Sequence, residues 1–189
     1  MARPFSVRQA AYRAALAATS FLLAATAAGG QGQTPNVRTV LPGFDQPILL
    51  DTLALARPIS GKREEILAAV NSVLVEWKIL IEEREGTAGR TEHVRAEVSR
   101  RIGGEPISKY LNCGRGFSGN NADFYRLRLA IAAWPFPLEG EPKELRIATI
   151  ASGRDPAGSR SSYGACASNG KLEERLWARV VELLEAGGK

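Results

Sequence analysis

The chain has 189 residues, 25 of them basic and 20 acidic, and a formal net charge of +5. Three of the basic residues, Arg3, Arg8 and Arg13, lie in the first 30 residues, which hold no acid. The remaining 22 basic and 20 acidic residues are interspersed, which argues against a basic stripe for nucleic acid, and their span suits one domain with a single core.

Residues 1–30 predict a secretory signal peptide. The three arginines precede an uncharged run of apolar and small residues, AALAATSFLLAATAA (14–28). This run is shorter than the roughly 20 residues that a membrane-spanning helix needs, and ATA (25–27) has the small-x-small pattern of a processing site. A retained membrane anchor is the alternative. We expect a periplasmic or secreted protein with no stable membrane span after processing.

In an exported chain the only two cysteines, Cys113 and Cys166, predict a structural disulfide. A catalytic thiol would need a base, and the single histidine, His93, lies in an alternating polar and apolar stretch where we expect an exposed strand residue. Two cysteines and one histidine without paired spacing are also a poor zinc-ligand set. We therefore expect neither a metal nor a cofactor.

Residues 31–59 predict an extended leader that could hold a first short strand, and residues 60–189 predict a single α+β domain. A helix near 60–77 is indicated by apolar residues at helical spacing: Ile66, Val70, Val73, Leu74 and Trp77. A closing helix near 170–186 shows the same pattern in Leu172, Leu176, Val180, Leu183 and Leu184. Both have glutamates in the first turn, where carboxylates complement the helix dipole.

Between the helices the apolar period changes to two, which predicts antiparallel strands over 78–85, 92–98, 123–134 and 143–152 and a short strand over 161–166. The clearest strand places Tyr125, Leu127, Leu129, Ile131 and Ala133 on one side. We predict an antiparallel sheet of four or five strands with two packed helices, a helix-grip-like arrangement.

The stretch WPFPL (134–138) interrupts this pattern. Its two prolines cannot donate ladder hydrogen bonds, so we expect Trp134 and Phe136 at a strand end or edge and only partly covered. They are candidates for contact with a partner. The alternative is a local plug over the end of the sheet.

Gly114, Gly116 and Gly119 have the G-x-G-x-x-G spacing of a dinucleotide-binding loop. That loop must lead from a strand into a helix, whereas here a strand follows, so the glycines are interpreted as turn residues. Ser118 lies in GFSGN (116–120), one residue short of the G-x-S-x-G elbow of hydrolases, and is interpreted as a loop hydroxyl.

Three short stretches, YLNCG (110–114), NAD (121–123) and CASNGKLEERL (166–176), resemble a set of uncharacterised bacterial envelope proteins. Those proteins have a Cys-Gly, an Ala-Asp before a strand and a closing Cys-x-Ser-x-Gly-x-Leu-Glu helix start. The resemblance implies a helix, an antiparallel sheet and a second helix packed against it, similar to the helix-grip domains of outer-membrane assembly lipoproteins. This chain lacks their lipidation cysteine.

From these patterns we expect no enzyme but a binding or assembly module of the bacterial envelope, with an envelope protein as its partner. A carrier of a small apolar ligand, bound in a groove between sheet and helix, is the first alternative. A hydrolase that uses carboxylates such as Asp123 with Glu173 is the second. An apolar cavity would favour the carrier, whereas a solid core with an exposed apolar patch would favour the binding module.

Overall fold

A computed structural model describes residues 35–85, 90–117, 119–158 and 162–187, all within one structural unit, Gly32–Lys189. The predicted signal peptide, residues 86–89 between the first two strands predicted after the helix, and Ser118 lie outside the described residues.

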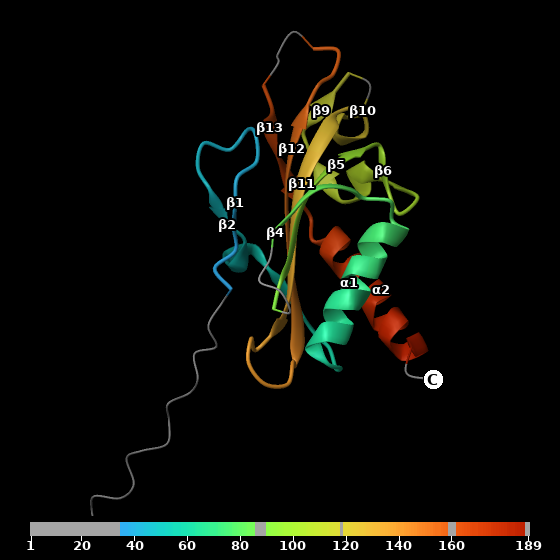
Figure 1. The fold of residues 1–189 in the computed structure, drawn as a ribbon. Helices are drawn as coiled ribbons and strands as arrows, with labels where there is room; N and C mark the ends of the chain where they lie inside the picture. Colours follow the sequence, from blue (N-terminus) through green and yellow to red (C-terminus); the bar gives the residue numbers. More distant parts are fainter. Residues whose placement is uncertain (1–34, 86–89, 118, 159–161, 188–189) are drawn as a thin grey trace, which may run out of the picture. The chain divides into compact units, whose positions relative to one another are not determined.

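Among the described residues, the largest sheet has seven antiparallel strands (Figure 1). Its order is β4-β5-β11-β12-β13-β8, and β3 pairs with β12 on the edge that β13 also uses. The strands are β3 (Leu55–Pro58), β4 (Leu80–Glu85), β5 (Glu92–Ser99), β8 (Leu111–Asn112), β11 (Arg126–Phe136), β12 (Glu144–Arg154) and β13 (Gly164–Ser168). The structure confirms the α+β class with two helices. The predicted four or five strands were too few, because a pairing as short as β8 shows no alternation.

The centre of the sheet is the hairpin of β11 and β12. Each strand has 11 residues, and every residue of one pairs with a residue of the other, from Arg126 with Arg154 to Phe136 with Glu144. Leu127, Leu129 and Ile131 face one side and are buried, as their alternation predicts. The opposite side of this pair is buried as well, so both faces of the hairpin are covered.

Two helices cover the first face, α1 (Arg63–Glu76) and α2 (Lys171–Gly187) (Figure 1). Ile66, Val70 and Leu74 of α1 pack in the same buried cluster as Leu176 and Val180 of α2, as the two helical stripes predict. Trp77, which ends α1, is only 7 % exposed in this cluster.

The N-terminal segment covers the second face (Figure 1). It comprises β1 (Arg38–Thr39), β2 (Ile48–Leu49) and the 3-10 helix η1 (Leu50–Leu53). Leu41 and Leu50 are buried against Ala130, Ala132 and Ala148 of the hairpin, whose short side chains allow close approach. Residues 35–53, part of the stretch for which composition predicts a leader, thus supply one of the layers of the unit, and the same stretch also holds β3, a strand of the sheet.

Short elements connect β5 to β11. They are β6 (Arg101–Ile102), β7 (Glu105–Pro106), η2 (Ile107–Lys109), β9 (Arg115–Gly116), β10 (Gly119–Asn120) and η3 (Asn121–Asp123). Gly114, Gly116 and Gly119 lie in and beside the β9–β10 hairpin, and η3 and β11 follow. The glycines therefore belong to turns, as predicted, and do not lead into an α-helix.

The expectation that Trp134 is only partly covered was wrong, and its burial agrees with the alternative of a local plug. Its side chain is 0 % exposed and packs in the second buried cluster with Leu41 and Leu50. Strand β11 also continues through Pro135, because β5 ends opposite Ala133 and leaves β11 with β12 as its partner there, an edge position that tolerates proline.

Phe136 is half-buried, and the Arg146 guanidinium lies 3.6 Å from its ring centroid. Arg63 donates hydrogen bonds to the carbonyl oxygens of Pro135 (2.7 Å) and Pro137 (2.6 Å), which ties α1 to this end of the hairpin. A role of Phe136 in partner contact stays a prediction.

Cys113 and Cys166 form a disulfide, as the sequence predicts. Cys166 lies in β13 opposite Ala151, and Cys113 directly follows β8, which pairs with β13. A Cβ at Gly153 would lie 2.7 Å from Leu127 Cδ2 and 3.2 Å from Cys166 Sγ, so any larger residue would displace side chains where the disulfide meets β12.

We predict that Cys113→Ser or Cys166→Ser lowers the free energy of unfolding by about 2–5 kcal/mol, because the bond closes a loop between residues 53 apart. Denaturant unfolding of the oxidised protein and of each variant measures the loss. Alkylation under denaturing, non-reducing conditions is the control and should find no free thiol. Two alkylated thiols in the wild-type protein would contradict the assignment.

We further predict that Trp134→Ala costs about 3–5 kcal/mol of stability, since it removes a fully buried indole. Phe136→Ala, two residues along the same strand, should cost clearly less because that ring is only half-buried. Urea unfolding measures both losses. Equal losses of unfolding free energy in the two variants would contradict this prediction.

Candidate functional site

The edge of β12 that faces away from β11 is interrupted. Strand β3 pairs with it up to Ile147, and β13 pairs with it from Ala151 onward. In the part of the chain that the structure describes, Ala148, Thr149 and Ile150 therefore have no strand partner on this edge. Backbone groups of successive strand residues alternate in direction, so at least one of the three directs its N–H and C=O into the gap.

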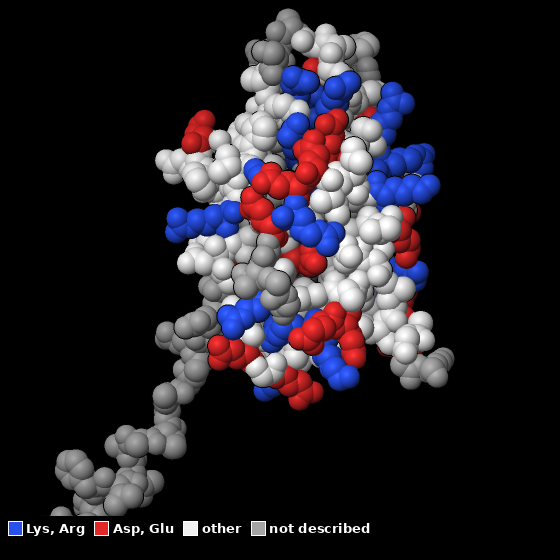
Figure 2. All heavy atoms as spheres, viewed as in Figure 1, with Lys and Arg blue, Asp and Glu red and all other residues white. Residues whose placement is uncertain are grey.

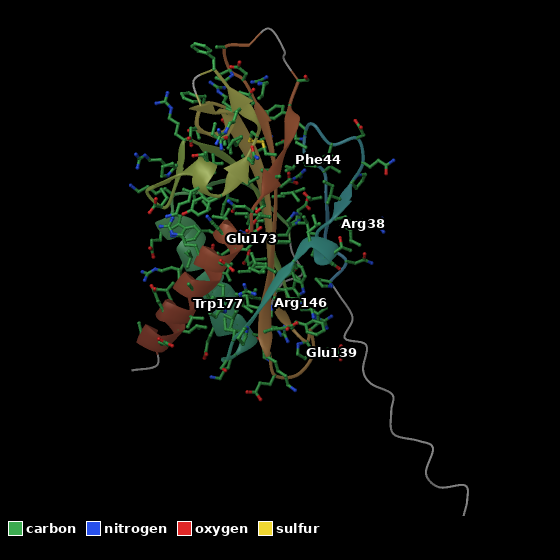
Figure 3. All side chains as sticks on the ribbon, turned by 180° about the vertical axis from the view of Figure 1, so that it is seen from behind. Arg38, Phe44, Glu139, Arg146, Glu173 and Trp177 are labelled. Carbon is green, nitrogen blue, oxygen red and sulfur yellow. A yellow bond between two sulfur atoms is a disulfide. The ribbon has the colours of Figure 1, made fainter. Side chains whose placement is uncertain are left out.

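A cavity of about 400 Å³ occupies this gap. The N-terminal segment and the strands β3, β12 and β13 supply its apolar walls. These walls consist of Phe44, Ile48, Leu53, Ala54, Leu55, Ile150, Cys166 and Ala167. Leu53 is 54 % exposed, so the cavity reaches the surface. In Figure 3, Phe44 comes from the N-terminal segment and Glu173 from the end of α2 nearest the sheet.

Thr149, Ser168 and Glu173 give the cavity a polar end. Glu173 lies in the first turn of α2 and is only 4 % exposed. The Ser168 hydroxyl lies 3.0 Å and 3.2 Å from its two carboxylate oxygens. Thr149 is 5 % exposed, and its hydroxyl has no hydrogen-bond partner among the described residues.

Part of this polar end is the cap of α2. Gly170 N–H donates to Ser168 Oγ at 3.3 Å, and Lys171 N–H donates to Asn169 Oδ1 at 3.1 Å. An acid in the first turn is also stabilised by the positive end of the helix dipole. The sequence thus explains why a glutamate stands at 173, but not why its side chain is buried.

Asp123, the carboxylate considered with Glu173 for a hydrolase, has a structural role. Its Oδ1 accepts a hydrogen bond from Ser108 N–H at 3.0 Å, which links η3 to η2. In the described part of the chain, no hydrogen bond or ion pair joins it to Glu173.

A second cavity, of about 340 Å³, lies between α2 and the segment that leaves β3. Trp177, labelled in Figure 3, forms part of its wall and donates an indole hydrogen bond to the Pro58 carbonyl oxygen at 2.9 Å. Val181 and Leu184 are its apolar members on α2, and Lys143 and Glu185 are charged residues in its lining.

His93 was expected to be exposed, yet it is 3 % exposed. The side chain of His93 lies on the face of β5 opposite to the buried Val94, as alternation predicts. That face is covered by a cluster of charged side chains and is not open to solvent. Arg95 pairs there with Glu83 and Glu85, and Glu85 lies 3.5 Å from His93 Nδ1. Figure 2 shows acidic and basic side chains interspersed over the face in view.

Burial lowers the pKa of His93 from its ordinary 6.5, and the Arg95 guanidinium lowers it further while Glu83 opposes the change. His93 Nε2 has no hydrogen-bond partner among the described residues. The surroundings of the imidazole thus favour its neutral form.

Within the ranges that the structure describes, no three or more His, Cys, Asp and Glu side chains are grouped so that they could hold a metal ion. No described helix is long and apolar enough to cross a membrane.

Comparisons with known protein families, curated proteins and solved structures find no match for this chain. The resemblance to bacterial envelope proteins therefore stays a prediction, and the site must be interpreted from its own geometry.

We predict that acid destabilises the wild-type protein more than the variant His93→Gln between about pH 7.5 and 5.5. Because the folded-state pKa is lowered, the unfolded chain takes up this proton first as the pH falls below 6.5. The neutral imidazole therefore contributes its full share of the folding stability above pH 6.5. That share is lost as the pH falls through the folded-state pKa. Urea unfolding at several pH values tests this, and since the chain has one histidine, equal pH slopes would disprove it.

Proposed function

We propose that this protein is an exported, non-catalytic binding protein of the bacterial envelope, and that the cavity at the β12 edge holds a small ligand with a mainly apolar body. The observation that carries the proposal is the interruption of strand pairing at residues 148–150, which opens a cavity at the edge of an otherwise well-packed sheet.

The size and lining of the cavity support a small ligand. Its volume of about 400 Å³ falls within the range of pockets that hold small molecules, and such pockets combine apolar walls with a few polar groups. Its walls are contributed by the N-terminal segment, by the sheet and by α2. Of the two binding roles expected from sequence, the carrier of a small ligand is therefore favoured over the assembly module.

The roles of the polar side chains support a function without catalysis. Ser168 donates to Glu173 and accepts from the N–H of Gly170, so its hydroxyl serves the helix cap. Asp123 links two short helices. These groups already have structural partners, which is typical of side chains that stabilise a fold.

The test is calorimetric titration of the purified, oxidised protein with 1-octanol. We expect saturable binding with one site, which Ala54→Trp abolishes because a bulky side chain fills the cavity at its apolar wall. Val75→Trp is the matched control, since Val75 is 65 % exposed on α1 and is not part of the cavity lining.

Thermal unfolding of both variants verifies that each is folded. Absence of saturable binding, or undiminished binding by a folded Ala54→Trp variant, would refute the proposed site.

A further inference from the structure

We propose that the ligand of the cavity at the β12 edge carries a cationic amine head group, which pairs with the carboxylate of Glu173. This inference rests on the proposed function and adds to it the chemical class of the ligand.

The first argument is charge. Among the described residues that line the cavity, Glu173 is the only one with a charged side chain, and it is only 4 % exposed. No ion pair to it occurs within the described ranges, whereas its neighbour Glu174 is exposed and pairs with Arg57 at 2.7 Å. Burying a carboxylate without a cation is costly, so a cation that enters this cavity gains a partner there.

The second argument is the count of hydrogen bonds. A carboxylate can accept about four of them, and the Ser168 hydroxyl has a single proton to share between the two oxygens of Glu173. The cap of α2 therefore leaves acceptor capacity on the carboxylate unused. An ammonium group, with three donors and no acceptor, matches this need.

The third argument is independent of the helix end. Thr149 belongs to the central strand β12, lines the same cavity and is 95 % buried, yet its hydroxyl lacks a partner in the described structure. A buried, unpaired hydroxyl is destabilising, and it can accept a hydrogen bond from a bound ammonium. The backbone carbonyl groups of the unpaired β12 edge offer further acceptors.

The charge of the head group distinguishes an amine from the two alternative ligand classes, which have an anionic or a neutral head group. An anionic head group would face the Glu173 carboxylate, and the described part of the lining holds no basic side chain to offset the repulsion. A neutral hydroxyl could bind Thr149 but would gain no charge interaction. The apolar walls, which include the Phe44 ring, suit a short alkyl or aryl body.

Three probes with the same chain separate these cases: octylammonium, 1-octanol and octanoate, each titrated by calorimetry below its aggregation concentration. We expect octylammonium to bind about tenfold or more tightly than 1-octanol, the gain typical of a charge-assisted hydrogen bond, and octanoate to bind most weakly. This comparison uses the unsubstituted protein, so it does not depend on whether a variant folds.

Two variants then locate the charge. Glu173→Gln should reduce the affinity for octylammonium to that for 1-octanol, because it removes the charge but keeps a similar shape. Glu174→Gln is the matched control and should leave both affinities unchanged, since Glu174 is not part of the cavity lining. Thr149→Val should weaken the binding of octylammonium severalfold.

The possible failures are distinguishable. Equal affinities for octylammonium and 1-octanol, or an unchanged octylammonium affinity in folded Glu173→Gln, would overturn the amine assignment and leave the proposed function standing. Absence of binding by all three probes would overturn both.

Discussion

The complete pairing of β11 with β12 is the constraint on which the rest of this structure depends. All 11 residues of each strand take part, and both faces of the pair are buried. Large side chains such as Leu129 and Ile131 meet the helices, whereas Ala130, Ala132 and Ala148 on the other face leave room for the N-terminal segment. The difference in side-chain size between the two faces allows a helical layer on one and an irregular layer on the other.

The same hairpin determines where a ligand can enter. One edge of β12 is fully used by β11, and the other is shared by two short strands, β3 and β13, which leave a gap between them. Strand β13 supplies Cys166, Ala167 and Ser168 to the cavity, and it is held by only three register pairs with β12. The disulfide to Cys113 anchors this wall, so an oxidising compartment, with which the bond is compatible, also favours an intact cavity.

Local patterns in the sequence predicted the two helices and the longer strands of the sheet. Both helices follow from apolar residues at helical spacing, and β4, β5, β11 and β12 follow from alternation. The errors at Trp134 and His93 have one physical cause, which is that the second face of the sheet is also covered. The run LAIAAW (129–134) is almost continuously apolar, as expected for a strand buried on both sides, yet its proline neighbour favoured an exposed edge for Trp134. His93 was misjudged because alternation predicts direction, not exposure.

The candidate site could be predicted only in part, since it is defined by a strand pairing that is absent. Glu173 follows from sequence as a first-turn acid, and Thr149 as a strand residue in phase with Leu145 and Ile147. Neither pattern indicates that the strand edge beside Thr149 is open, because that depends on where β3 begins, at Leu55, and on where β13 stops pairing with β12, at Cys166, more than 100 residues apart in the chain. A carboxylate that is ordinary in an isolated helix becomes a binding group only where long-range pairing buries it beside an unpaired hydroxyl and an apolar wall.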